Sequence, residues 1–173
     1  MLGIQEKFND LEAEKEYLAK QLNGNKYVSI IANAVKTSNT FLEKNKELLA
    51  DRLKAGFFRD CHGDLHSRNI FLLPLPQPFD CIEFNDDYRQ IDVLNEVAFL
   101  CMDLDSFGKK DLSEFFIIDY DQFFPSMISS KERHLFVFYK AYRANGRAKV
   151  NSLRATRAVT EIARTIALFD VDN

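Results

Sequence analysis

Cysteine, glycine and proline are scarce in this sequence, and tryptophan is absent. Its 173 residues include 3 cysteines, 6 glycines and 4 prolines. Cys61, Cys81 and Cys101 are odd in number and evenly spaced, whereas a disulfide framework needs paired cysteines and a structural zinc site needs closely spaced ones. No amino-terminal stretch combines a basic start with an apolar core, as a secretory signal would. We therefore expect a reduced, cytoplasmic protein.

Long apolar runs and basic blocks are missing as well. No run approaches the ~20 apolar residues that are needed to cross a bilayer. A formal net charge of -3 without a lysine-arginine block argues against binding to nucleic acid or to an anionic membrane. We expect small molecules or proteins as partners. A chain of this length with 46% hydrophobic residues is predicted to form a single compact domain.

The first third of the chain has the apolar spacing of helices. Apolar side chains recur at helical intervals over residues 4–22 and again over 27–53, and an Asn-Gly-Asn turn at 23–25 separates the two runs. Gly56 follows the second run as a natural helix stop. Residues 1–56 are therefore predicted to form a helical hairpin.

Short strands and then further helices are expected after this hairpin. Residues 57–90 contain short aromatic and branched runs, among them 81–84, joined by polar or proline-rich links. Three prolines within 73–79 cannot donate ladder hydrogen bonds, so this stretch is predicted to link the strands of a small β-hairpin. Residues 91–173 return to helical periodicity, with helices expected at about 93–104, 110–124, 131–150 and 152–169. The predicted fold class is α+β, mainly α.

A polar loop between two of the predicted strands has the residues of a phosphoryl-transfer site. Residues 62–69 read His-Gly-Asp-Leu-His-Ser-Arg-Asn, which places Asp64 and Asn69 five residues apart. In phosphoryl transfer a carboxylate accepts the proton of the attacking hydroxyl, and an amide oxygen helps to hold the magnesium that bridges the phosphates. A second metal ligand is expected after the hairpin, where Glu83 follows Asn69 by fourteen residues. His66 and Arg68 flank the aspartate and are candidates for contact with substrate or phosphate.

This segment resembles the catalytic region of the aminoglycoside phosphotransferase and choline kinase-like family, distant relatives of the protein kinases. The shared pattern is His-Gly-Asp-x-x-x-x-Asn, then Ile-Asp, which reads Ile-Glu here, then an aspartate before a helix. The resemblance implies ATP and magnesium as cofactors, with Asp64 as the catalytic base and His62 as a brace of the loop. It implies that Asn69 and Glu83 ligate magnesium, although Glu83 is one methylene longer than the family's aspartate. It also implies that Asp92 fixes the loop through backbone hydrogen bonds.

The residues before His62 do not resemble the other lobe of such kinases. That lobe grips ATP with a β-sheet, a phosphate-covering loop and a lysine paired with a glutamate, whereas the 61 residues before His62 read as two helices with scattered glycines. We therefore expect residues 1–173 to be a kinase-like carboxyl-terminal lobe that lacks the amino-terminal nucleotide lobe. It would be a fragment of a longer kinase, half of a complex, or a pseudo-enzyme. A P-loop partner domain would lie outside this chain, because its Gly-x-x-x-x-Gly-Lys-Ser/Thr motif does not occur here.

Two other functions remain open on the sequence alone. His62, Asp64 and His66 alternate as the ligands of a metal-dependent hydrolase would, although His134 is the one histidine left to complete such a site. A non-catalytic interaction domain is the other alternative. The function that we expect is ATP-dependent transfer of phosphate to a hydroxyl of an unidentified small-molecule or protein acceptor, since pocket shape and not the motif sets specificity.

Overall fold

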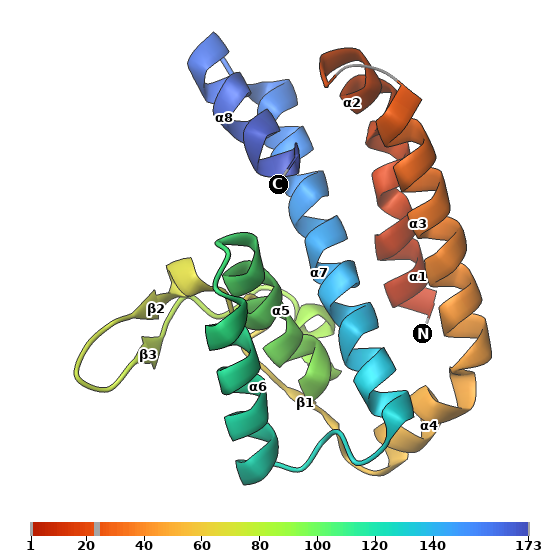
Figure 1. The fold of residues 1–173 in the computed structure, drawn as a ribbon, viewed down its shortest axis with the longest axis vertical. Coiled ribbons are helices and arrows are strands. Elements are labelled where there is room, and N and C mark those ends of the chain that lie inside the picture. The colour runs from red at the N-terminus through yellow and green to blue at the C-terminus, as the bar shows by residue number, and fades with distance from the viewer. Residues whose placement is uncertain (1, 23–24, 173) are drawn as a thin grey trace. The chain divides into compact units, whose positions relative to one another are not determined.

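The computed structural model describes residues 2–22 and 25–172 and is mainly helical, with 72% helix and 6% strand (Figure 1). This confirms the predicted α+β, mainly α class. The turn expected at residues 23 and 24 lies outside the described residues. The chain divides into two compact units, Met1–Lys46 with Ala144–Asn173, and Glu47–Arg143. In the described part of the chain, every helix is too short or too polar to span a membrane.

The first unit consists of helices that bury a shared apolar stripe. Its elements are α1 (Leu2–Asn9), the 3-10 helix η1 (Asp10–Glu14), α2 (Lys15–Gln21), α3 (Asn25–Lys44), the end of α7 (Ser130–Arg157) and α8 (Glu161–Asp172). Figure 1 shows α1 and α2 lying along α3. The buried side chains of this core include Phe8, Leu11 and Leu18 from the first three elements, and Ile31, Val35 and Leu42 from α3. The 3-10 helix η1 interrupts the first helix of the hairpin that the sequence predicted for residues 1–56.

Helix α7 continues through the residues at which the sequence predicted a break between two helices. Asn151 and Ser152 are polar, yet both are buried in the structure. Ser152 Oγ donates a 2.7 Å hydrogen bond to the Glu14 carboxylate, and Asn145 Nδ2 donates one of 2.8 Å to the carbonyl of Phe8. These hydrogen bonds satisfy buried polar side chains within the helix, so the helix is not broken at the predicted position. It continues to Arg157.

The second unit contains the motif loop, two small sheets, helices α4, α5 and α6, and the beginning of α7. Its elements are α4 (Lys46–Lys54), β1 (Phe58–Asp60), η2 (Ser67–Asn69), β2 (Ile70–Phe71), β3 (Gln77–Pro78), η3 (Asp86–Tyr88), β4 (Gln90–Asp92), α5 (Val93–Ser106), α6 (Lys110–Phe123) and the beginning of α7. β1 pairs antiparallel with β4, Phe58 opposite Asp92, and β2 pairs with β3, Ile70 opposite Pro78. The second pairing forms a small hairpin, as predicted, but its second strand, β3, lies inside the proline-rich stretch that was predicted to be the link. The hairpin projects from the helices of this unit in Figure 1.

Residues 81–84 are not a strand, contrary to the sequence prediction. Asp80 has a φ of 62°, a left-handed conformation that turns the backbone just before this segment. The Ile82 N–H then donates a 3.0 Å hydrogen bond to the carbonyl of His62 and does not join a ladder. The segment consequently lies against the motif loop.

Helix α5 is the buried centre of the second unit. All residues from 92 to 101 are buried, and α6 packs along the helix. Asp92 is the N-cap, with an extended backbone and a side chain that accepts a 2.9 Å hydrogen bond from Leu94 N–H. This cap fixes the start of the helix that supports the motif loop.

Candidate active site

The motif loop makes a tight turn that glycine alone can occupy without strain. Gly63 has a φ of 85°, and a Cβ at this position would lie 2.9 Å from the Tyr88 carbonyl oxygen and 3.2 Å from the Ile82 side chain. A larger residue would meet both the unfavourable φ and the contact with rigid backbone. The glycine of the motif is thus required by the packing of the 80–88 segment against the loop.

Asp64 is held by two hydrogen-bond donors from its own loop. Asn69 Nδ2 donates to the Asp64 backbone carbonyl and to Oδ2, both at 3.1 Å, and His66 Nε2 lies 3.4 Å from the same Oδ2. The hydrogen bond from His66 lowers the pKa of Asp64 below its ordinary value, against the effect of burial, which raises it. The carboxyl group is therefore ionised at neutral pH, and its side chain is still 41% exposed.

His62 contacts the loop backbone through both ring nitrogens. Its Nδ1 accepts a 3.3 Å hydrogen bond from Asp64 N–H, so Nε2 carries the proton and donates to the Phe79 carbonyl at 2.8 Å. No lone pair of this ring is then free to bind a metal. In residues 2–22 and 25–172, no three His, Cys, Asp or Glu side chains are grouped as a metal site. This geometry does not favour the hydrolase alternative.

His66 and Arg68, the candidates for substrate contact, differ in their surroundings. His66 is buried, with its ring 5.4 Å from that of Phe99. Its Nδ1 accepts from Arg68 N–H at 3.3 Å, and its Nε2 faces Asp64. The ring therefore orients the aspartate and does not reach out to a substrate. The Arg68 side chain is exposed.

Glu83 lines the same cleft as Asp64. The cleft has a volume of about 760 Å³ and is lined by Asp64 and by residues 80–84. The Glu83 side chain is exposed, whereas Asn69 is buried beside Asp64. The Asn69 amide directs its nitrogen to Asp64, so its oxygen is the atom that this contact does not use. An amide oxygen and a carboxylate are the hard oxygen ligands that magnesium prefers, and magnesium needs few of them from the protein when phosphates complete its shell.

The backbone of the loop is fixed by Glu96, and not by Asp92 as predicted. Glu96 Oε1 accepts a 3.0 Å hydrogen bond from His62 N–H, and Oε2 accepts one of 3.1 Å from Gly63 N–H. Burial raises the pKa of Glu96, and the Arg143 guanidinium and the loop N–H groups oppose that shift. Glu96 lies one turn into α5 and holds the N–H groups of His62 and Gly63.

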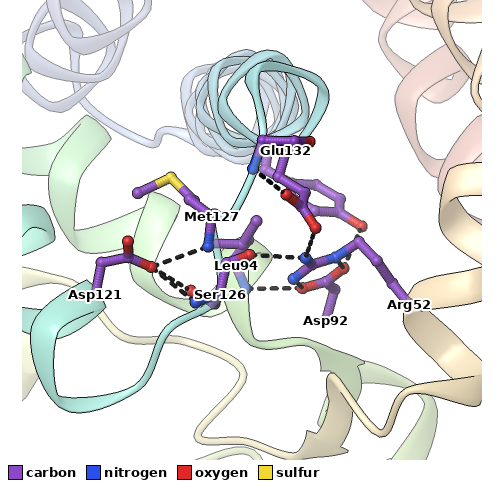
Figure 2. A network of polar contacts seen from close by, with 9 residues as sticks. Arg52, Asp92, Leu94, Asp121, Ser126, Met127 and Glu132 are labelled. Carbon is purple, nitrogen blue, oxygen red and sulfur yellow. Dashed lines mark hydrogen bonds and ion pairs between the residues drawn. The ribbon is translucent and has the colours of Figure 1, made fainter.

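Asp92 has a different structural role, shown in Figure 2. Both of its oxygens accept hydrogen bonds from Arg52, at 2.7 and 2.8 Å, and the carboxylate caps α5 through Leu94 N–H. Arg52 also donates to the Ser126 carbonyl at 2.8 Å. Because the N-cap backbone is extended, the Asp92 side chain turns toward α4 and the loop after α6. It joins these elements to the start of α5.

Arg143 is a site residue that the sequence did not reveal. Its Nη1 donates a 3.0 Å hydrogen bond to the Gly63 carbonyl, its Nε donates to Asn95 Oδ1 at 2.7 Å, and its Nη2 lies 3.9 Å from Glu96 Oε2. The guanidinium also lies 4.7 Å from the centre of the Phe99 ring. The one sequence signal was its membership of a basic stretch in α7, which gives no partner. The loop is eighty residues away along the chain.

The chain matches no protein-family model and no solved structure. It is 38% identical over 124 residues, 71% of its length, to uncharacterized protein Rv2004c of Mycobacterium tuberculosis (strain H37Rv). The same values hold for uncharacterized protein MT2060 of Mycobacterium tuberculosis (strain CDC 1551) and uncharacterized protein Mb2027c of Mycobacterium bovis. The aligned region is 24% of each relative, so the chain spans about a quarter of the length of the curated relatives that it matches.

Proposed function

We propose that this chain is the catalytic, carboxyl-terminal lobe of an ATP-dependent phosphotransferase resembling the aminoglycoside phosphotransferase and choline kinase-like enzymes. It belongs in this proposal to a longer kinase, and its acceptor is a hydroxyl of a small molecule or protein. The observation that carries the proposal is the charge and the orientation of the Asp64 carboxyl group. This carboxylate is ionised, partly exposed to the cleft that Glu83 also lines, and oriented by Asn69 and His66.

The geometry of Asp64 suits a base that accepts a proton from the attacking hydroxyl. The hydrogen bonds from Asn69 and His66 both reach Oδ2. Oδ1 is therefore the oxygen that accepts the proton of the acceptor hydroxyl in this mechanism. Because the two donors and the backbone contacts of the loop hold the carboxylate in place, little reorganisation is needed when the hydroxyl attacks.

Asn69 and Glu83 are the residues that would hold magnesium. Their oxygen ligands fit this ion, which when bound would neutralise the charge of the ATP phosphates. The extra methylene of Glu83 lengthens its reach from the backbone of the 80–84 segment. The exposed Arg68 remains a candidate for contact with phosphate.

The test is phosphate transfer from γ-labelled ATP to a panel of small hydroxyl compounds, using a complete, nucleotide-binding form of the protein. Asp64→Asn keeps the shape of the side chain and removes the base, so turnover should fall by ~10² or more while the fold is preserved. Asp87→Asn is the matched control, because Asp87 is exposed in the turn of η3 and should leave turnover unchanged. Equal turnover of Asp64→Asn and the unmodified protein would remove Asp64 from the mechanism.

A second candidate function is a non-catalytic domain that binds another protein. The observation that favours it is the outer face of α6, where Leu112, Phe115, Ile118 and Phe123 are 48 to 86% exposed. The same experiment separates the two functions. A complete protein that folds and binds its partner, yet transfers no phosphate with Asp64 intact, supports the interaction domain.

A further inference from the structure

Helix α5 presents a second buried carboxylate to the motif loop, two turns after Glu96. Asp103 is 2% exposed. Its Oδ2 accepts hydrogen bonds from Ser67 N–H at 2.9 Å and from Ser67 Oγ at 2.5 Å. Residues seven apart on a helix lie on one face, so Glu96 and Asp103 meet the loop from the same side of α5.

The two carboxylates hold the loop on either side of Asp64. Glu96 binds the N–H groups of the two residues before Asp64, and Asp103 binds Ser67, three residues after it. Phe99, between them on α5, packs against the His66 ring. A carboxylate is costly to bury unless it is hydrogen-bonded. Each of these two buried carboxylates therefore needs its hydrogen bonds to the loop.

We infer that Asp103 is a positioning residue for the proposed phosphotransferase, acting through Ser67 and His66 on Asp64. Ser67 directly follows His66 and begins η2, whose Arg68 N–H binds His66 Nδ1. Holding Ser67 therefore fixes the backbone on which the His66 ring is set. The Nε2 of this ring in turn lies 3.4 Å from Asp64 Oδ2. The role rests on the proposed function, but each contact in the sequence Asp103, Ser67, His66, Asp64 can be measured without activity.

The first experiment uses nuclear magnetic resonance on the 173-residue chain. Asp103→Asn should raise the hydrogen exchange rate of Ser67 N–H roughly tenfold or more. The exchange rate of Arg68 N–H, which binds His66 Nδ1, should rise with it as the His66 ring loosens. The matched control is Asp105→Asn, the same change on the same helix, where the carboxylate pairs with Lys140. The control should change neither exchange rate. If Asp103 served only the packing of α5, the exchange rate of Arg68 N–H would stay unchanged.

Ser67→Ala tests the same contact from the loop side, where the change leaves the α5 core intact. It should raise the exchange rate of Arg68 N–H in the same direction as Asp103→Asn, and Ser67→Thr, which keeps the hydroxyl, should restore the slow exchange. In the complete enzyme, Asp103→Asn and Ser67→Ala should lower kcat roughly tenfold with little change in the KM for ATP, because small misplacements of a catalytic group reduce the rate of the chemical step.

Failure of this inference is distinct from failure of the proposed function. Unchanged exchange of the N–H groups of residues 67 and 68 in both variants would refute the positioning role, even if Asp64→Asn abolishes turnover. Full turnover of Asp64→Asn would refute the proposed function, whatever the exchange rates. Faster exchange at both positions together with a reduced kcat would support both.

Discussion

Arg52→Met should destabilise the protein more than any surface substitution, because Arg52 is the centre of a buried polar network. Its side chain is 2% exposed and that of Asp92 is 0% exposed. Two hydrogen bonds of 2.7 and 2.8 Å join the pair, a third of 2.8 Å reaches the Ser126 carbonyl, and Glu132 lies 3.5 Å away. Methionine fills a similar volume but cannot compensate the charge of Asp92 (Figure 2).

The expected magnitude follows from this geometry. Removing one partner of a buried ion pair leaves an uncompensated charge and costs about 3–5 kcal/mol. The Leu94 N–H and the Tyr139 hydroxyl, which also contact Asp92, retain part of its stabilisation. We therefore expect the free energy of unfolding to fall by ~3 kcal/mol or more, a large share of the roughly 5–15 kcal/mol of a typical domain.

Urea denaturation of the 173-residue chain, followed by circular dichroism, is the assay. With an m-value of about 1–3 kcal/mol/M, the midpoint should fall by roughly 1–3 M. Lys54→Met is the control, since Lys54 and Asp51 form an exposed pair at 3.9 Å that should contribute less than ~1 kcal/mol. Adding Asp92→Asn to Arg52→Met should recover part of the loss, because the unpaired charge is removed. A loss below ~1 kcal/mol, or no recovery in the double variant, would refute this reasoning.

Three further predictions concern the loop, the metal and the nucleotide. Gly63→Ala should destabilise the chain by about 1–3 kcal/mol, because residue 63 has a positive φ and its new Cβ would contact the Tyr88 carbonyl. In the control Gly146→Ala, inside α7, the new Cβ meets nothing within 4 Å and should stabilise the chain by ~0.5–1 kcal/mol. Equal melting temperatures of the two variants would contradict this prediction. Glu83→Gln removes charge from an exposed side chain, so the magnesium titration of activity should weaken without loss of stability, and an unchanged titration would exclude Glu83 as a ligand. In the isolated chain, residues 2–22 and 25–56 form helices and turns and contain no sheet that could hold a nucleotide. The chain should therefore bind ATP with magnesium only in the millimolar range, a binding free energy of about -4 kcal/mol. Micromolar binding by calorimetry would show that these helices hold the nucleotide themselves.

The sequence by itself determined the features that depend on neighbouring residues. Helical spacing predicted most helices, and the glycine at 56 marked the end of α4. The prolines of 73–79 indicated a hairpin in this region, although Pro78 lies in its second strand and not in its link. The contact of Asp64 with Asn69 was also within reach of the sequence, because five residues of a tight loop bring these two side chains together. Each of these features is set by local sterics and hydrogen bonding, which a short pattern records.

Tertiary structure alone decided which distant side chains complete the site. The choice between Asp92 and Glu96 depends on the extended backbone of the N-cap, which turns Asp92 toward Arg52 and leaves the loop N–H groups to Glu96. Arg143 reaches Gly63 because α7 packs beside α5, a contact that no local pattern encodes. Likewise, Asn151 appeared to interrupt a helix and was instead buried within one. Burial sets the partners of charged and polar groups, since a group removed from water must bind whichever neighbour the fold brings to it.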